Sequence, residues 1–131
     1  MQFGTITELG ILFHDLCDGH AQWSQTTFGS DANRGPTGPL KHLVKEAGEA
    51  REAFERVVEF ATSEDSVAAG SAHDDFREEM ADCLLLVLDA ARRGGVSGPK
   101  LLAAAMAKLE KNRGRKWGAA SAAEPVHHVK G

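Results

Sequence analysis

Two pairs of acidic residues with three-residue spacing border the apolar stripes of two amphipathic segments. Glu46 and Glu49 form the first pair, and Glu79 and Asp82 form the second. Residues three apart on a helix project from the same side, so each pair presents its two carboxylates together. If the two segments pack through their apolar stripes, four acids converge in one groove.

Carboxylates that border a core need a positive partner, because an unpaired charge away from water is costly and neighbouring like charges raise the pKa. Mg²⁺ and Mn²⁺ prefer oxygen ligands and often bridge to substrate phosphates. Neither segment contains the Glu-x-x-His motif of a di-iron carboxylate bundle. The sequence therefore predicts an Mg²⁺ or Mn²⁺ site. Its candidate ligands are Glu46, Glu49, Glu79, Asp82 and, two turns further along, Asp89.

The alternative is that such acids belong to solvated helix faces, where pairs at this spacing are common. We interpret four other acids in this way, since each has an arginine nearby to pair with. These are Glu52, Glu55, Glu59 and Glu78, with Arg51, Arg56 and Arg77 as partners.

Apolar residues at helical spacing predict the four helices that position these acids. Their approximate bounds are 5–26, 39–61, 74–95 and 97–113. The first begins with the capping box Thr5-x-x-Glu8. A small polar linker at 62–73 is expected before the third, with Asp74 or Asp75 as its N-cap, Gly94-Gly95 as its stop, and Ser97 capping the fourth.

The predicted fold class is all-α, a four-helix bundle formed by residues 1–118, with a tail or short extra element at 119–131. The third helix is apolar over more than half of its circumference, and one monomer supplies few neighbours for such a surface. We therefore expect self-association into a homodimer or homotetramer.

Composition excludes several classes of protein. The 131-residue chain has a net charge of −4, which offers no footprint for nucleic acid. Its longest apolar run, residues 83–88, is too short to cross a bilayer, and no signal peptide is evident. A reducing cytoplasm is the expected compartment. The spacing His14-x-x-Cys17-x-x-His20 suggests zinc, but no second ligand pair is evident, which favours an ordinary helix.

The acid pattern E-x-x-E…E-x-x-D resembles the all-α nucleoside triphosphate pyrophosphohydrolases, the MazG-like proteins. Four further motifs resemble the phage-type dATP/dGTP diphosphohydrolase branch. They are WSQTTFG at 23–29, GP at 35–36 with HLxKE at 42–46, LxLDAxRxG at 86–94, and KxxKNxxRxW at 108–117. The resemblance covers about residues 20–118 and implies hydrolysis of a (d)NTP to (d)NMP and pyrophosphate, in the host cytoplasm if the chain is phage-encoded.

The resemblance also implies roles for the acids. Glu46, Glu49, Glu79 and Asp82 would hold two or three Mg²⁺ ions, and Glu49 or Glu46 would orient the attacking water. Asp89 would bind a metal or hold Lys111 or Arg115 in place.

Several residues are candidates for substrate binding. Lys108, Lys111, Asn112 and Arg115 share a side of the fourth helix and could bind the β and γ phosphates. The alternative is favourable charge at a helix C-terminus. Lys45 could also contact phosphate. Trp23 could stack on a base or belong to the core. Thr26 and Thr27, with Asn33 and Arg34 as looser candidates, could bind base edges.

The resemblance favours purine (d)NTPs as substrates, dGTP above the others, with dATP and GTP included. A related pyrophosphohydrolase of the dUTP or phosphoribosyl-ATP type is the alternative among enzymes. The alternative from another class is a non-catalytic helical module that binds cations or a protein partner.

Overall fold

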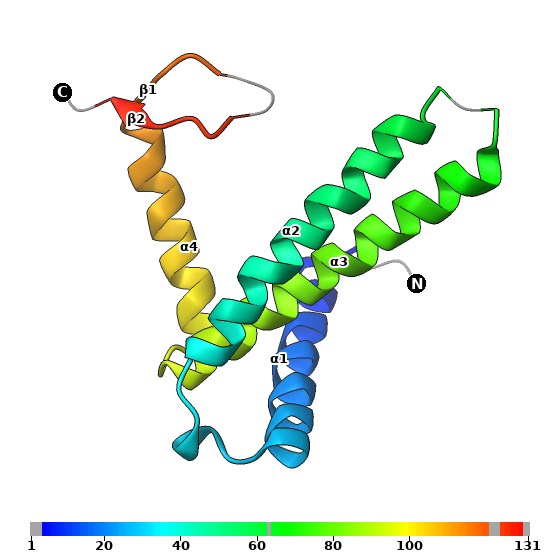
Figure 1. The fold of residues 1–131 in the computed structure, drawn as a ribbon. Coiled ribbons are helices and arrows are strands. Elements are labelled where there is room, and N and C mark those ends of the chain that lie inside the picture. Colours follow the sequence, from blue (N-terminus) through cyan, green and yellow to red (C-terminus); the bar gives the residue numbers. More distant parts are fainter. Residues whose placement is uncertain (1–3, 63, 121–123, 130–131) are drawn as a thin grey trace. The chain divides into compact units, whose positions relative to one another are not determined.

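The protein is built from four long helices and one pair of two-residue strands, which confirms the predicted all-α class (Figure 1). A computed structural model describes residues 4–62, 64–120 and 124–129. The helices are α1 (Ile6–Phe28), α2 (Thr37–Phe60), α3 (Ser66–Arg93) and α4 (Gly98–Arg113). A short 3-10 helix, η1 (Asp31–Asn33), precedes α2, and the strands are β1 (Lys116–Trp117) and β2 (His128–Val129).

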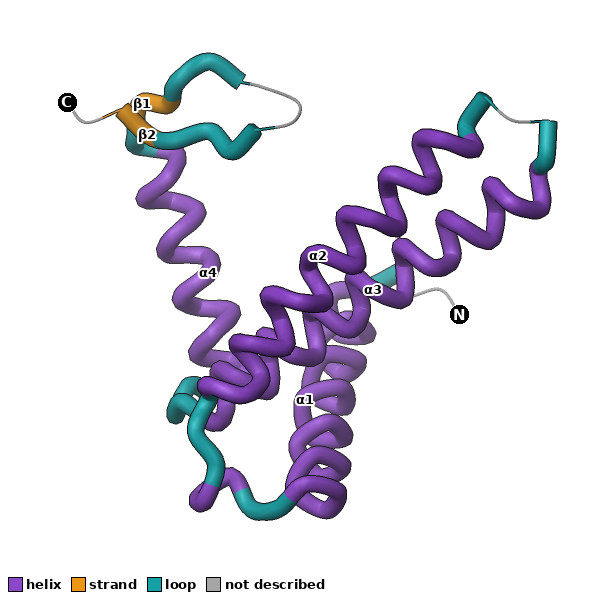
Figure 2. Tube along the Cα trace, in the orientation of Figure 1, coloured by secondary structure: helices purple, strands orange, loops and turns teal. Residues whose placement is uncertain are grey.

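The chain divides into two units, residues 1–98 and 99–131, and each is described by itself. In the first unit, α2 and α3 run antiparallel and pack against each other along much of their length, and α1 contacts α3 (Figure 2). In the second unit, α4 leads into the two strands, which pair antiparallel with Trp117 opposite His128. The indole N–H of Trp117 donates to the carbonyl oxygen of Asn112 at 2.9 Å.

Two predicted helix ends agree with the structure. The capping box of α1 is formed, with the amide of Glu8 donating to Thr5 Oγ1 at 3.0 Å and the amide of Thr5 donating to Glu8 Oε2 at 3.2 Å. The helix stop after α3 uses Gly95, whose φ of 85° is one that residues with a Cβ rarely adopt. The amide of Gly95 donates to the carbonyl oxygen of Arg92 at 3.0 Å.

The predicted start of the third helix is wrong. Residues 66–73 are helical and Asp65 is the N-cap, its carboxylate accepting from the amides of Val67 and Ala68 at 3.1 and 3.0 Å. Neither Asp74 nor Asp75 caps the helix, since both lie within it. The alanines of this stretch favour helix, and Ala72 is buried, so packing outweighs the cost of Gly70. Ser63, in the predicted linker, lies outside the described residues.

The hydrophobic core of the described residues consists mainly of small side chains. Ala50 and Ala53 of α2 and Ala72 of α3 are buried, together with Leu88 and Ala90. Alanines at the α2–α3 contact let the two helices approach closely, which brings side chains at the edge of the contact within reach of each other. None of the described helices is long and apolar enough to cross a membrane.

Many large apolar side chains remain exposed on the single chain. On α3 they include Met80, Leu84 and Val87, three members of the wide apolar face noted in the sequence. Homo-oligomer formation stays a prediction. Of the predicted tail, residues 119–120 and 124–129 are described, and 121–123 and 130–131 lie outside the described residues.

Candidate functional site

Three of the predicted acids meet between α2 and α3. Glu46 of α2 and Glu79 and Asp82 of α3, here called the acid cluster, each contribute a carboxylate oxygen, and these oxygens lie within 4.8 Å of one another. Glu46 is 8% exposed, Glu79 is half-buried and Asp82 is exposed. The three-residue spacing places Glu79 and Asp82 on one side of α3, and the packing of α2 on that side adds Glu46.

Glu49, the fourth predicted acid, lies beside the acid cluster. It is half-buried, one turn along α2 from Glu46, and its side chain lies within hydrogen-bonding reach of Glu46. Lys45 Nζ lies 3.8 Å from Glu49 Oε1, and the Lys45 side chain is otherwise exposed. Within the part of the chain that the structure describes, Glu49 is not one of the three acids whose oxygens meet.

The carboxyl groups of Glu46 and Glu79 lie close together, and their pKa values are shifted in opposite directions. The hydrogen bond to Glu46, followed by burial and by the charges of Glu46, Glu49 and Asp82, raises the pKa of Glu79 to about 7. The same hydrogen bond from Glu79, followed by one from Glu49, lowers the pKa of Glu46. His42 Nε2 lies 2.9 Å from Glu46 Oε1 and further favours the charged form of Glu46. Below about pH 7, Glu79 is therefore the group that carries the proton shared with Glu46.

The acid cluster fits a hard divalent cation. Carboxylate oxygens are the ligands that Mg²⁺ and Mn²⁺ prefer, and one oxygen of Glu79, Oε2, is buried without a hydrogen-bond partner. Such an orphaned acceptor is costly unless something positive or hydrogen-bonding reaches it. Among the described residues, this is the one group of three or more possible ligands whose donor atoms converge.

The raised pKa of Glu79 predicts how the stability of the metal-free protein depends on pH. The ordinary pKa is 4.5, so the folded state holds a proton that the unfolded state has lost between that pH and about 7. The contribution of Glu79 to the free energy of unfolding should therefore fall as the pH rises through this window, while His20, whose pKa is lowered by burial, contributes with the opposite sign. The lowered pKa of Glu46 acts below it. Melting temperatures in EDTA between pH 5 and 8 measure the effect.

Glu79→Gln should remove this decline, because the variant has no proton to lose. Glu78→Gln, at an exposed neighbouring position, is the matched control and should keep the wild-type slope. An equal decline in the Glu79→Gln protein would show that another group causes the pH dependence.

A cavity of about 390 Å³ opens between α1, α2 and α3 in the first unit. Glu46 and Asp82 of the acid cluster line it, and so do Ser24, Asp89 and Arg93. This volume lies within the range of small-molecule sites. The cavity therefore connects the acids to a second, differently charged group of side chains.

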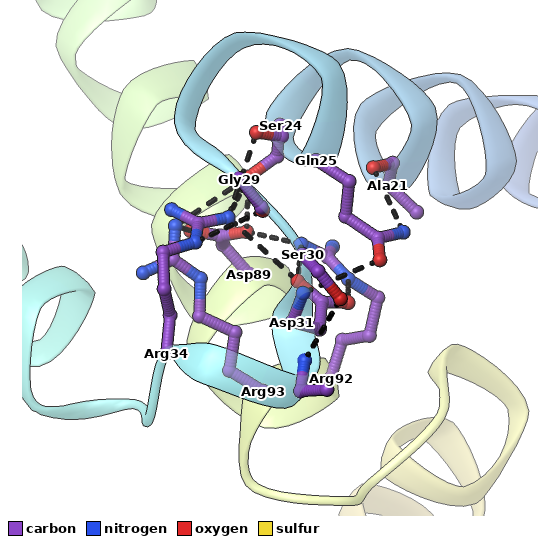
Figure 3. Close-up of polar contacts among 11 residues, drawn as sticks. Ala21, Ser24, Gln25, Gly29, Ser30, Asp31, Arg34, Asp89, Arg92 and Arg93 are labelled. Carbon is purple, nitrogen blue, oxygen red and sulfur yellow. Dashed lines mark hydrogen bonds and ion pairs between the residues drawn. The ribbon is translucent and has the colours of Figure 1, made fainter.

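That second group is a network of three arginines, two aspartates and a serine, here called the arginine network. Its members are Ser24, Asp31, Arg34, Asp89, Arg92 and Arg93 (Figure 3). Figure 3 shows them converging from α1, from η1 and the loop after it, and from the end of α3. Three of the pairs in contact, Ser24 with Asp89, Asp31 with Arg92 and Ser24 with Arg93, join residues more than 50 positions apart in the sequence.

Asp89 is the centre of the network. It is 6% exposed, and its Oδ1 accepts hydrogen bonds from Ser24 Oγ at 3.1 Å and from Arg92 Nη2. Its Oδ2 lies 2.9 Å from Arg93 Nη2. Arg92 Nε also donates to Asp31 Oδ2 at 2.7 Å, and this bond lowers the pKa of Asp31. Both aspartates are thus paired with arginines.

The structure places Asp89 among polar partners of its own unit. The resemblance made it a metal ligand or a partner of Lys111 or Arg115, and its carboxylate contacts Ser24 and two arginines. Among the described residues it is not one of the acids whose oxygens converge. These contacts favour a role in positioning the arginines, and its role as a metal ligand stays a prediction.

The other predicted substrate-binding residues lie in different surroundings. Trp23 is 55% exposed and lines the cavity, so the alternative of a buried core tryptophan is wrong. Thr26 and Thr27 are exposed near the end of α1, and Asn33 is exposed in η1. Arg34, a looser candidate, is half-buried and lines the cavity.

Four predicted phosphate-binding residues belong to the second unit. Lys108 and Lys111 are exposed on α4, while Asn112 and Arg115 are half-buried. Asn112 Oδ1 is buried without a hydrogen-bond partner, and the amide of Arg115 donates to the carbonyl oxygen of Asn112 at 3.2 Å. Their role as phosphate ligands stays a prediction.

Several residues of the site were not predicted from the sequence. His42 lies four residues before Glu46, a spacing that predicts contact on a helix and could have revealed it. Ser24 lies within the motif at 23–29 but shows no local sign of its role. Arg92 lies within the motif at 86–94 and Arg93 follows it, but neither position indicates its distant partners.

Comparison with known proteins agrees with the acid pattern. The family model described as dATP/dGTP pyrophosphohydrolase matches residues 16–64 and 58–131, which together are most of the chain. No curated protein and no solved structure matches the sequence. The chain therefore belongs to the dATP/dGTP pyrophosphohydrolase family and is a nucleoside triphosphate pyrophosphohydrolase, as its resemblance to the phage-type branch of the MazG-like proteins predicted.

Proposed function

We propose that the protein hydrolyses purine (deoxy)nucleoside triphosphates between the α and β phosphates, giving (d)NMP and pyrophosphate. dGTP is the favoured substrate, and dATP and GTP are also accepted. The observation that carries this proposal is the acid cluster at the side of a cavity of about 390 Å³. The family match supports dATP and dGTP as the substrate class.

Glu46, Glu79 and Asp82 would hold Mg²⁺ or Mn²⁺. Glu49 would become the fourth carboxylate ligand if its side chain rotated away from Lys45. Two or three ions are expected at one site. When bound, they supply positive charge to the phosphate oxygens and lower the pKa of a water molecule. The carboxylates keep these charges fixed next to the cavity, so little reorganisation is needed when substrate enters.

Glu49 is the better candidate for orienting the attacking water. Glu46 is already engaged by His42, Glu79 and Glu49, whereas Glu49 is half-buried, with Glu46 within hydrogen-bonding reach and Lys45 as an ion-pair partner at 3.8 Å. A carboxylate in this position can accept a hydrogen bond from water and receive its proton. Lys45, Lys108, Lys111, Asn112 and Arg115 stay candidate phosphate ligands, and Thr26 stays a candidate base contact.

Self-association is part of the same proposal. Apolar side chains remain exposed on both helices that carry the acids, including Val44 and Phe54 on α2 and Leu84 on α3. Burial of such surfaces favours a homodimer or homotetramer. Light scattering coupled to size-exclusion chromatography measures the mass, and a monomer at working concentration would contradict this part of the proposal.

The test of the reaction is a product analysis with dGTP, dATP, GTP, dCTP, dTTP and dUTP in the presence of Mg²⁺ or Mn²⁺. Chromatography of the nucleotides and a pyrophosphate assay should give equal amounts of dGMP and pyrophosphate from dGTP. An EDTA reaction is the control. Orthophosphate release would contradict the cleavage position, and preference for dUTP or another pyrimidine would contradict the purine assignment. The absence of any product would favour a non-catalytic module.

A further inference from the structure

The cavity has two chemically different ends. The acid cluster contributes Glu46 and Asp82 at one end. Asp89 lies seven residues beyond Asp82 on α3, a separation of about 10 Å along the helix axis. Arg34 and Arg93 line the cavity near Asp89. A nucleotide whose α-phosphate lies at the acids would therefore extend its sugar and base, or else its terminal phosphates, towards the arginines.

Ser24 fixes the two arginines that line the cavity. It is 1% exposed, and its hydroxyl oxygen accepts from Arg34 Nη2 at 3.2 Å and from Arg93 Nη2 at 3.4 Å. The hydroxyl proton is donated to Asp89 at 3.1 Å. Arg34 Nε is also held by the carbonyl oxygen of Gly29 at 3.1 Å. The guanidinium groups are thus oriented before any ligand binds.

This end of the cavity has donors that the protein itself does not use. The side chain of Arg93 is 9% exposed, and its Nε is buried without a hydrogen-bond partner. Within the described residues, Arg34 donates hydrogen bonds through Nε and Nη2, which leaves Nη1. His20 Nδ1, on a residue that also lines the cavity, is buried without a partner and is a donor or an acceptor according to the tautomer of the ring. Unused arginine donors are costly when they are away from water, so those of Arg34 and Arg93 favour a ligand that carries acceptors.

The remaining walls suit a flat, aromatic ligand. Trp23 and Phe28 line the cavity with their rings nearly perpendicular, at 87° and with centroids 5.4 Å apart. The guanidinium carbon of Arg34 lies 5.8 Å from the centroid of the Phe28 ring. A purine can stack on one ring and touch the edge of the other. The three arginines of the network outnumber its two aspartates, so acceptor atoms are favoured there over donors.

We propose that the arginine end of the cavity is the base-recognition subsite, and that Arg34 and Arg93 select guanine by donating to its O6 and N7 atoms. This inference rests on the proposed function. Arginine opposite O6 and N7 is the commonest specific contact to guanine, and adenine replaces the O6 acceptor with an amino donor. An adenine at this subsite places two donors against each other, so dGTP is selected over dATP. Ser24 and Asp89 are positioning residues for the two arginines.

Base analogues test this inference on the unaltered protein. dITP keeps O6 and N7, 2-amino-dATP has amino groups at positions 2 and 6, and 7-deaza-dGTP lacks N7. We expect kcat/KM for dITP to be close to that for dGTP. The values for dATP and 2-amino-dATP should be lower than that for dGTP by at least about tenfold. The value for 7-deaza-dGTP should lie between them. Faster cleavage of 2-amino-dATP than of dITP would overturn the proposal, because position 2 would then be the one recognised.

Arg34→Gln tests the residue directly, because glutamine suits the N6 and N7 atoms of adenine. The ratio of kcat/KM for dGTP to that for dATP should fall at least about tenfold. Arg51→Gln is the matched control, since Arg51 is exposed on α2 and pairs with Glu55. The ratio of kcat/KM for dGTP to that for dATP should be unchanged in this variant.

The outcomes separate this inference from the proposed function. Pyrophosphate release from dATP by the Arg34→Gln protein, with the ratio lowered, supports both. An equal loss with dGTP and dATP, in a protein that melts like the wild type, would overturn base recognition and assign Arg34 to the phosphates. Absence of pyrophosphate from every purine nucleotide with the unaltered protein would instead contradict the reaction itself.

Discussion

Asp82→Asn should lower kcat for dGTP at least about 100-fold while the helical circular dichroism signal stays unchanged. Replacing a partner that only supports a metal ligand costs about 10- to 100-fold in many metalloenzymes, and loss of a direct, charged ligand should cost more. Asp82 is exposed, so folding does not depend on it, yet its carboxylate oxygen lies within 4.8 Å of those of Glu46 and Glu79. The effect should therefore appear in turnover and not in the fold.

Steady-state kinetics at saturating dGTP and Mg²⁺, with melting curves for each variant, measure this prediction. Asp75→Asn is the matched control, since Asp75 is an exposed acid on the same helix and lies outside the acid cluster. It should retain wild-type turnover. Full activity of the Asp82→Asn protein, or an equal loss in the control, would remove Asp82 from the proposed metal site.

The part of the site that the sequence predicted is the part set by local geometry. The positions of Glu79 and Asp82 relative to each other follow from one turn of a helix, and the apolar stripes of the two segments indicated that α2 and α3 face each other. The exact register of the two helices decides which α2 acid meets them. That register depends on side-chain packing around Ala50 and Ala53, which spacing does not reveal, so Glu49 lies beside the acid cluster.

The arginine network illustrates what spacing cannot predict. Ser24 contacts Asp89 across 65 positions, and Asp31 contacts Arg92 across 61. A serine in a helix and an aspartate in a Gly- and Pro-rich loop are common everywhere, so neither residue signals a distant partner. The three-residue spacing of Asp89 and Arg92 was visible, but the same spacing is typical of ordinary solvated pairs.

The misplaced start of α3 has a different cause. The composition of residues 62–73 is typical of a linker because it includes Ser, Gly and Asp. Asp65, however, caps a helix whose first turns contain several alanines, and Ala72 is buried. Small residues serve equally in loops and at close helix contacts, so their composition alone does not distinguish the two.

The second large effect concerns stability. Asp89→Asn should lower the free energy of unfolding by about 3 kcal/mol, because removal of one partner of a buried ion pair leaves the other charge uncompensated. Here two arginines depend on the same carboxylate, and the Arg93 side chain is 9% exposed. An asparagine retains one acceptor for Ser24 or Arg92 but carries no charge. Urea unfolding in EDTA at neutral pH measures the change.

Asp74→Asn is the matched control, since Asp74 pairs with Arg77 at 3.4 Å on the exposed surface of the same helix. Exposed pairs contribute at most about 1 kcal/mol, so this change should be small. The comparison in EDTA and in Mg²⁺ also separates the two interpretations of Asp89. If its carboxylate serves the arginines, the loss is the same in both buffers. If it were a metal ligand, the variant would match the wild type in EDTA and would lose only the stabilisation that Mg²⁺ provides.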